Sequence, residues 1–323
     1  MPIEIGNASS HIDLLAKLRT FLTATLPSNI RWQQQRYITT SGSEELILRG
    51  VGSAGTDFIY IGFKAYSITT GQGNYGLILN GFTGYNASLS FYEQPGAMTV
   101  ANTLTALPLQ STNTTNYWFI ANGRRVIIIA QIGTVFHQAY LGFGIPYGTP
   151  SQWPYPLIIG GSAAVRNAGS NVGIPIEGTS ITNTVHAFWK PVNVSDVTNF
   201  SSAVGNLALR SPGGDYRRPY IVSGSPNNSA YSGTWPYTEG VRNTYGGILN
   251  MRSVLNSSTY SLTPIMIVEG NPPNVWGEFD GIRHITGFNV NSTFTVTVNG
   301  VSWMCVNNVF RTGNDERMAV RLD

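Results

Sequence analysis

The chain has 323 residues, of which 42% are hydrophobic and only 11% are charged, and its formal net charge is +3. Its 16 tyrosines, 14 phenylalanines and 7 tryptophans exclude an intrinsically disordered chain, because disorder goes with high charge and few aromatic residues. The longest basic clusters are the pairs Arg124-Arg125 and Arg217-Arg218, which argues against a nucleic-acid-binding stripe.

The basic residues favour contacts with other proteins. The chain has 16 arginines but only three lysines, and arginine is preferred where a cation is partly buried, stacked or held by a carboxylate. A soluble monomer usually carries a charged surface, so a chain with so few charges is expected to cover much of its surface with other protein. A neutral, polar surface is the alternative interpretation.

The location of the chain is predicted from what its sequence lacks. The N-terminus has no basic region followed by an apolar core, so no signal peptide is expected. The longest apolar run, Val126–Ala130, is far shorter than the ~20 residues of a membrane span, so no membrane insertion is expected. Cys305 is the single cysteine, which excludes an intrachain disulfide. The chain is therefore expected to be made in the cytoplasm.

The first predicted element is an amphipathic helix. Apolar residues recur at spacings of three and four from Ile12 to Leu22, which is the pattern of a helix with one apolar stripe. Ser9 or Ser10 can cap its start, and Pro27 places its end near Leu26. Such a helix can dock on its own domain or on a partner.

The rest of the sequence indicates strands. Short apolar runs bounded by Gly, Ser or Asn begin at residues 44, 57 and 75. Both faces of the run 57–67 are apolar, which predicts a strand buried on both sides. Near the C-terminus, Thr293, Thr295 and Thr297 alternate with apolar residues and predict a half-exposed strand.

Two Asn-Gly pairs predict hairpins. Asn122-Gly123 lies between two apolar runs, and Asn299-Gly300 does the same near the end of the chain. Both residue types tolerate the positive φ that a type I′ turn requires. Arg124 and Arg125 follow the first turn directly and are expected at the hairpin mouth, in solvent or at an interface.

Two loop-rich segments are candidates for recognition. Residues 144–156 contain four prolines and cannot form a central strand, and residues 210–240 form a long segment rich in Gly, Pro and Tyr. The apolar face of the helix, the arginine pairs and the aromatic residues of these loops are the predicted interface. Its residues are Leu14, Leu18, Phe21, Arg124, Arg125, Tyr147, Trp153, Tyr155, Arg217, Arg218 and Trp235.

These elements predict a mainly β fold, with one or more antiparallel sandwich- or barrel-like domains and one N-terminal amphipathic α-helix. We divide the chain into a docking helix at 1–27, a β domain at 28–160 and a second, loop-rich β region at 161–323. The last two can form one continuous domain.

No residue pattern indicates catalysis. The four histidines lack metal-ligand spacing, and the glycine-rich run 71–76 is followed by neither a helix nor a lysine. The best polar cluster contains Glu278, Asp280, Arg283 and His284. Two carboxylates two residues apart can bind a cation or act as acid and base, but structural pairing is the more common role. We predict no catalytic residues, cofactor or metal site.

Several blocks carry a family resemblance. They are "LLAKLRTFLT", the run from "ELILRGVGSAGTDF" to "NGFTGY", the run from "NYWFIANGRRVIIIAQ" to "PLIIGGS", and the terminal "CVNNVFRTGNDERMAVRLD". In this order they resemble virion structural proteins of contractile-tailed bacteriophages. The resemblance covers residues 161–290 much less well. It implies assembly and not catalysis, and it brings no catalytic residues with it.

The resemblance gives the functional hypothesis. The chain is expected to be a non-enzymatic structural subunit of the virion, in the tail or baseplate, that binds other tail proteins and copies of itself in a ring of trimeric or hexameric symmetry. One alternative is a receptor-binding module at the tail periphery that stacks host-surface glycans on its aromatic loops. Others are a collar or head-completion protein and a tail-associated glycan hydrolase using Glu278 and Asp280.

Overall fold

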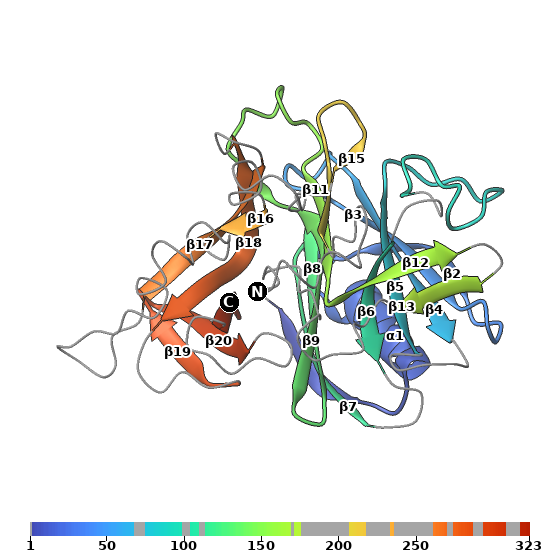
Figure 1. Cartoon of the computed structure of the whole chain (residues 1–323), viewed down its shortest axis with the longest axis horizontal. Helices are drawn as coiled ribbons and strands as arrows, with labels where there is room; N and C mark the ends of the chain where they lie inside the picture. The colour runs from blue at the N-terminus through green and yellow to red at the C-terminus, as the bar shows by residue number, and fades with distance from the viewer. Residues whose placement is uncertain are drawn as a thin grey trace.

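A computed structural model describes most of the chain, and Figure 1 shows the arrangement of its elements. The described residues are 2–67, 75–98, 104–109, 114–168, 171–175, 207–217, 233–235, 261–269, 274–286, 293–307 and 317–323. They form three antiparallel β-sheets and one α-helix near the N-terminus, which confirms the predicted mainly β class. None of the described sheets closes on itself, so the architecture is of the sandwich type.

The central sheet joins the N-terminal strand to strands from the middle of the chain. Its strands, in spatial order, are β1 (Ile3–Ala8), β7 (Thr115–Ala121), β8 (Arg125–Ile132), β9 (Val135–Phe143), β11 (Leu157–Gly161), β14 (Leu207–Arg210) and β15 (Tyr216–Arg217).

The helix-side sheet lies on one face of the central sheet. Its strands are β13 (Asn171–Pro175), β12 (Ala163–Ala168), β6 (Leu104–Leu109), β5 (Tyr75–Phe82), β4 (Ile59–Ser67), β3 (Glu45–Gly50) and β2 (Gln33–Ile38).

The C-terminal sheet lies on the opposite face. Its strands are β16 (Gly233–Trp235), β17 (Ser261–Glu269), β18 (Asn274–Thr286), β21 (Arg317–Arg321), β20 (Val301–Asn307) and β19 (Thr295–Val298), and β10 (Ile145–Pro146) pairs with β18.

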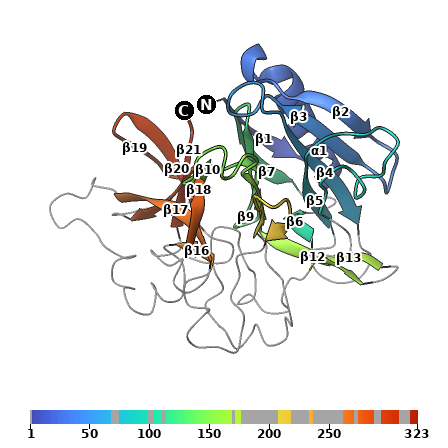
Figure 2. The same ribbon diagram turned by 90° about the horizontal axis from the view of Figure 1, so that it is seen from above.

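The central sheet is buried on both faces, because it lies between the other two sheets (Figure 2). On β8, Val126 and Ile128 belong to the hydrophobic core shared with the helix-side sheet, whereas Ile127 and Ile129 belong to the core shared with the C-terminal sheet. Side chains alternate between the two faces of a strand, so a strand covered on both faces needs no polar positions. This explains the uninterrupted apolar run of β8.

The N-terminal helix packs into its own chain. Helix α1 (His11–Thr20) is capped by Ser10, whose hydroxyl accepts a hydrogen bond from the Asp13 backbone N–H. It continues into a π-helical turn (Phe21–Thr25) and ends at Leu26, as Pro27 predicted. The short 3₁₀ helix Ser28–Ile30 follows. The helix was expected to dock either on its own domain or on a partner, and the structure shows it on its own domain.

Three predicted interface residues lie on this helical segment. The side chains of Leu14, Leu18 and Phe21 are each 0% exposed and belong to the core between the central and helix-side sheets. They complete the chain's own core and leave no surface for a partner, which corrects their expected placement.

The two Asn-Gly pairs behave differently. Asn299 and Gly300 have φ values of 52° and 77° between the paired residues Val298 and Val301, which confirms a tight two-residue hairpin with positive φ at both positions. Thr295 and Thr297 are exposed on β19, and Val296 between them is buried, so the predicted half-exposed strand is confirmed from Thr295 to Val298. Thr293, which the prediction included, lies before the strand with a positive φ of 65°.

The first pair also forms a hairpin, but the type I′ prediction is wrong. Neither Asn122 nor Gly123 is among the described residues with positive φ. The turn consists of residues 122–125, because Ala121 and Val126 are the last paired residues of β7 and β8. The Asn122 side-chain oxygen instead accepts hydrogen bonds from the backbone N–H groups of Arg124 and Arg125, at 2.9 and 3.0 Å. Asn122 thus stands at the first position of the turn and stabilises it through its side chain.

Strands on either side of residue 160 are hydrogen-bonded neighbours. β11 pairs with β9 and β14 in the central sheet, and β12 pairs with β6 in the helix-side sheet. The short β10 pairs with β18 of the C-terminal sheet. A boundary at residue 160 therefore falls inside β11 and between strands that share sheets.

His137 makes the stability of the fold depend on pH. It lies on β9 and is 5% exposed, and burial lowers the pKa of its imidazole to about 4. Between pH 6.5 and 4 the unfolded chain is protonated at this histidine and the folded chain is not, so stability falls as the pH falls. We expect a loss of about 3 kcal/mol across this window.

His137→Leu should remove this part of the pH dependence. The measurement is urea unfolding of both proteins at several pH values between 7 and 4, and the informative quantity is the difference between the two stability curves. Parallel curves would show that His137 does not titrate in this window.

Candidate interaction site at the junction of two sheets

Two adjacent arginines hold one carboxylate between the central and C-terminal sheets. Arg124 Nη2 lies 2.7 Å and Arg125 Nε lies 2.8 Å from Asp280 Oδ2. Arg124 lies in the turn of the β7–β8 hairpin, Arg125 is the first residue of β8, and Asp280 lies on β18. The Arg125 side chain is 0% exposed, which corrects the expectation that it lies in solvent or at an interface. Arg124 keeps 28% of its side chain exposed.

Two glycines make room for Arg125. A Cβ atom at Gly281 would lie 2.2 Å from Arg125 Nη2, and one at Gly142 would lie 2.4 Å from the Arg125 Cα. Both glycines also have positive φ, of 75° and 150°, which side chains rarely adopt. Gly281 therefore keeps space open for the guanidinium group, and Gly142 keeps space open for the backbone of Arg125.

The charges of this cluster fix the state of Asp280. Burial acts to raise the pKa of its carboxyl group, but the charges and hydrogen bonds of Arg125 and Arg124 outweigh burial and lower the pKa. Asp280 is therefore ionised at neutral pH and does not supply a proton as a general acid. Its role is to neutralise a buried guanidinium group.

The second carboxylate of the predicted polar cluster has separate partners. Glu278 Oε1 lies 3.0 Å from Arg283 Nη2, and Glu278 Oε2 accepts a hydrogen bond of 2.9 Å from the Tyr147 hydroxyl. Burial and this contact raise the pKa of Tyr147 to about 12. His284 is 2% exposed, and its Nδ1 lies 3.1 Å from the backbone oxygen of Arg317. Each member of the cluster thus has a structural partner.

Next to this cluster is an aromatic patch on the surface, which we call the Trp276 patch. Its members come from the loop after β10 and from β15, β17 and β18, and they are Tyr147, Trp153, Arg217, Glu269, Val275 and Trp276.

Trp276 holds this patch together. Its ring lies 5.4 Å from the ring of Trp153, and its Nε1 donates a 3.0 Å hydrogen bond to Glu269. The Arg217 guanidinium lies 5.7 Å from the Trp276 ring centre and 3.5 Å from the Glu269 carboxylate. The Tyr147 backbone N–H donates to the Trp276 carbonyl at 3.2 Å. Tyr147, Trp153, Arg217 and Glu269 therefore each contact Trp276.

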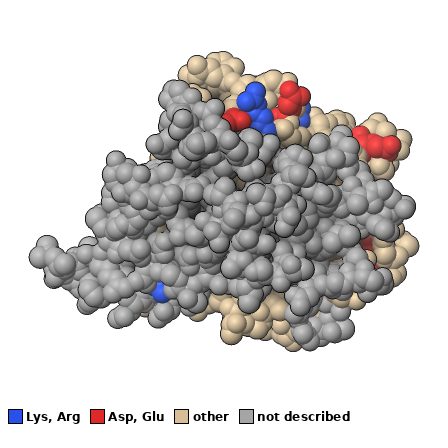
Figure 3. Space-filling model, in the orientation of Figure 1, with Lys and Arg blue, Asp and Glu red and all other residues tan. Residues whose placement is uncertain are grey.

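The patch also exposes apolar surface. Tyr147 is 50% exposed and Val275 is 43% exposed, whereas Trp153 is only 4% exposed. Trp153 supports the patch from below and donates a hydrogen bond to the Arg210 carbonyl. On the face shown in Figure 3, charged side chains of the described residues gather at the upper edge, where basic and acidic groups lie side by side.

The structure brings together only part of the predicted interface set. Tyr147, Trp153 and Arg217 meet in the Trp276 patch. Tyr155 turns inward, and its hydroxyl donates a 2.6 Å hydrogen bond to the Phe82 carbonyl. Arg218 lies outside the described residues, and so does the side chain of Trp235, whose backbone pairs with Met266.

Trp276, Val275 and Glu269 are not among the interface residues predicted from sequence. Trp276 is the third residue of β18 and follows Pro272 and Pro273 closely in the sequence, and an aromatic residue so near a pair of prolines is the signal that could have found it. Its partners Arg217 and Glu269 are not recognisable from sequence, because Arg217 lies on the edge of a different sheet.

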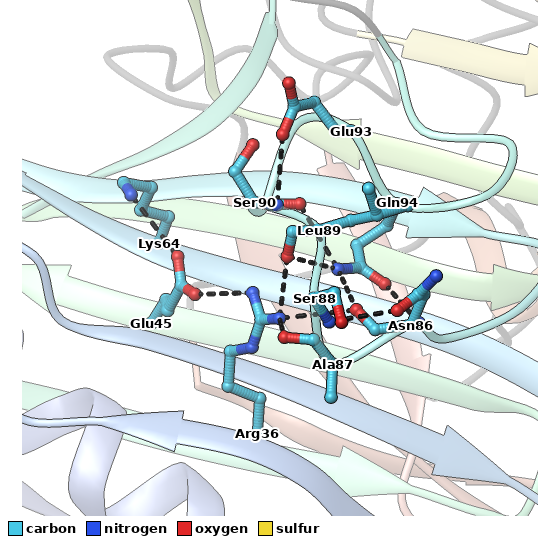
Figure 4. A network of polar contacts seen from close by, with 10 residues as sticks. All are labelled: Arg36, Glu45, Lys64, Asn86, Ala87, Ser88, Leu89, Ser90, Glu93 and Gln94. Atoms are coloured by element: carbon cyan, nitrogen blue, oxygen red, sulfur yellow. Dashed lines mark hydrogen bonds and ion pairs between the residues drawn. The ribbon is translucent and has the colours of Figure 1, made fainter.

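A second polar network attaches a loop to the helix-side sheet (Figure 4). Arg36 on β2 donates to Glu45 at 3.0 Å and to the Leu89 carbonyl at 2.7 Å. Lys64 lies 3.3 Å from the other oxygen of Glu45. Gln94 is 2% exposed and both donates to the Asn86 carbonyl and accepts from the Asn86 N–H. These contacts are internal and hold residues 86–94 in place.

Comparison with family models and curated proteins assigns no family to this chain, and the described residues include no metal cluster and no membrane-spanning helix. No family model matches the sequence, and no curated protein matches it. In the described part of the chain, no group of three His, Cys, Asp or Glu residues could hold a metal ion. The described helices also include none with the length and hydropathy needed to traverse a bilayer.

Loss of the Asp280 charge should strongly destabilise the fold. Asp280→Asn leaves Arg125 buried without a compensating charge, which costs about 3–5 kcal/mol. Asp323→Asn is the matched control, because its partner Arg321 is exposed and such pairs contribute about 0–1 kcal/mol. Urea unfolding at pH 7 compares the two variants. Equal losses would show that the buried pair is not important for stability.

Gln94 should control the local stability of residues 86–94. Gln94→Leu removes its hydrogen bonds to Asn86, so the backbone amides of this loop should exchange with solvent roughly tenfold faster or more. Hydrogen–deuterium exchange with mass spectrometry measures this. Ser88→Ala, at an exposed position of the same loop, is the control and should leave exchange unchanged. Unaltered exchange in Gln94→Leu would contradict the proposed anchoring.

Proposed function

We propose that this chain is a non-enzymatic structural subunit of a bacteriophage particle, in the tail or baseplate, that acts by burying surface against neighbouring proteins. The phage assignment comes from the resemblance of its sequence blocks. The structural observation that supports an assembly role is the Trp276 patch. Tryptophan, tyrosine and arginine are the residue types most enriched at the energetic centres of protein interfaces.

The geometry of the patch suits tight binding. Trp276 is fixed by Glu269, Trp153 and Arg217, and Tyr147 is fixed by its hydrogen bonds to Glu278 and to the backbone of Trp276. Side chains that are already ordered lose little conformational entropy when a partner binds. The exposed ring of Tyr147 and the side chain of Val275 supply apolar surface that a partner can cover.

The carboxylates support a structural role over a catalytic one. Asp280 neutralises two arginines, and Glu278 is held by Arg283 and Tyr147. A glycoside hydrolase needs one protonated acid and one free carboxylate near the same bond. Neither Glu278 nor Asp280 fits these roles, so a hydrolase centred on them is not proposed.

A second candidate function is a receptor-binding module for a host-surface glycan. It is favoured by the half-exposed ring of Tyr147, since aromatic rings stack on the apolar faces of sugars. The Arg217 and Glu269 side chains beside it offer hydrogen-bonding groups. The same patch therefore supports both candidates, and an experiment on the patch separates them.

The experiment combines particle composition with patch variants. Mass spectrometry of phage particles purified from cells that carry the encoding genome should find the chain as a stoichiometric component. The double variant Tyr147→Ala with Val275→Ser should reduce incorporation about tenfold or more, because it removes the exposed apolar surface of the patch. Phe58→Ala is the control, since Phe58 is 41% exposed elsewhere on the surface.

The outcomes separate the candidates. Poor incorporation of the double variant supports the structural role. Normal particles with impaired adsorption to cells, together with lost binding on a glycan array, would favour the receptor role. Absence of the chain from purified particles would reject the particle assignment altogether.

A further inference from the structure

Strand β1 forms one edge of the central sheet. It pairs on one side with β7, from Ile3 opposite Ile120 to Ala8 opposite Thr115, without a shift in register. On its other side no strand of the described residues is paired with it. The edge is six residues long and carries neither lysine nor proline.

The direction of the backbone groups of β1 follows from one contact. The Pro2 carbonyl accepts a hydrogen bond from the Ala121 N–H, so the even-numbered positions of β1 face β7. The odd-numbered positions must therefore turn their N–H and C=O groups outward. Lys17 confirms this direction, because its ammonium group donates to the outward carbonyl of Asn7. Ile3 and Ile5 present the remaining outward groups.

The other edges of the three sheets are protected by their geometry. β15 has two residues, β16 has three and β19 has four, which is too short for extensive pairing. β2 and the β12–β13 pair contain register shifts, which disrupt pairing with another strand. Among the described sheet edges, β1 alone is both regular and six residues long.

The side chain at the centre of β1 is also exposed. Ile5 is 64% exposed, the highest value among the large hydrophobic residues of the described part. It stands opposite Trp118 on β7, and two residues away Ile3 packs against the core shared with the C-terminal sheet. Long edges with exposed apolar side chains are usually covered in native proteins, because they pair readily with other strands.

We propose that β1 pairs with β1 of a second copy of this chain, antiparallel and centred on Ile5, so that two central sheets join across a twofold axis. The sequence of β1 is its own complement in this register. Ile5 faces Ile5 of the other copy, and Glu4 faces Gly6, so the two carboxylates do not oppose each other. Lys17 holds the Asn7 carbonyl, so the pairing consists of the two hydrogen bonds between the Ile5 residues and the bond from each Asn7 N–H to the Ile3 carbonyl of the other copy.

The pairing explains the exposed position of Ile5. Each Ile5 would exchange both of its outward backbone hydrogen bonds with its counterpart and bury its side chain against the counterpart and Trp118. Such an isologous contact uses the same patch on both copies. It does not depend on the phage assignment, and it concerns a surface separate from the Trp276 patch.

A disulfide at the centre of the proposed contact tests the register. Directly paired residues of this kind have Cα atoms about 5.5 Å apart, which is within the range that a disulfide spans. Ile5→Cys in the full chain should form a covalent dimer under mild oxidation. The native cysteine, Cys305, is 0% exposed and gives no background. Phe58→Cys, exposed at another site, is the control and should give at least about tenfold less dimer.

Sedimentation of the chain without added cysteines tests the contact independently. The wild-type chain should show a concentration-dependent monomer–dimer equilibrium, and Ile5→Lys should weaken it about tenfold or more, because two like charges would then face each other. At concentrations where the wild-type chain is monomeric, thermal unfolding of Ile5→Lys should match wild type, since the side chain is exposed in the monomer.

Three results would overturn the proposal. They are a wild-type chain that stays monomeric at every concentration, a dimer that Ile5→Lys leaves intact, and an Ile5→Cys chain that crosslinks no better than Phe58→Cys. Each is distinguishable from failure of the proposed function, which is decided by particle composition and by the patch variants.

Discussion

The contact between Arg125 and Asp280 decides how the C-terminal sheet sits on the central sheet. Both sheets meet through apolar side chains, and burial of apolar surface is favourable but has no direction. An ion pair with a fully buried guanidinium group has a strict geometry, because an unpaired charge in that position is costly. The hairpin end of β7 and β8 must therefore meet the middle of β18, and the glycines at 142 and 281 preserve the space for it.

Strand β18 connects the buried ion pair at Asp280 to the Trp276 patch on the surface. β18 contains Asp280, Glu278, Val275 and Trp276 within six residues, and β10 is paired with it at Glu278 and Gly277. Fixing Asp280 thus fixes the position of Trp276 relative to the central sheet. Arg217, on the edge strand β15 of that sheet, can then reach both the Trp276 ring and Glu269. The surface patch is a consequence of the buried ion pair.

The sequence predicts the local features of this chain better than its long-range ones. Helix α1, the apolar strand β8 and the hairpin at Asn299-Gly300 follow from spacing and from φ preferences of nearby residues. The turn at Asn122-Gly123 departs from its prediction because the Asn122 side chain bonds to the backbone two and three residues ahead.

The contacts of the candidate site were harder to predict, because their partners lie far apart in the sequence. The burial of Arg125 depends on a carboxylate 155 residues away, and Trp276 gains its partners from two different sheets. Single-sequence patterns carry no signal for such pairings. The sequence did single out Arg125, Asp280, Tyr147 and Arg217 as polar or aromatic candidates, but it could not show which of them meet.

The three-layer architecture limits how this chain can contact others. The described strands of the other two sheets lie on the two faces of the central sheet (Figure 2), so its own backbone can pair with a partner strand only along its two edges. One edge is β1, with Ile5 exposed, and the other is β15, whose Arg217 belongs to the Trp276 patch. A twofold contact at β1 leaves the opposite edge of each copy open. A pair joined in this way carries two Trp276 patches far from the shared axis, and can therefore bridge two further proteins, which is the property that an assembly subunit needs.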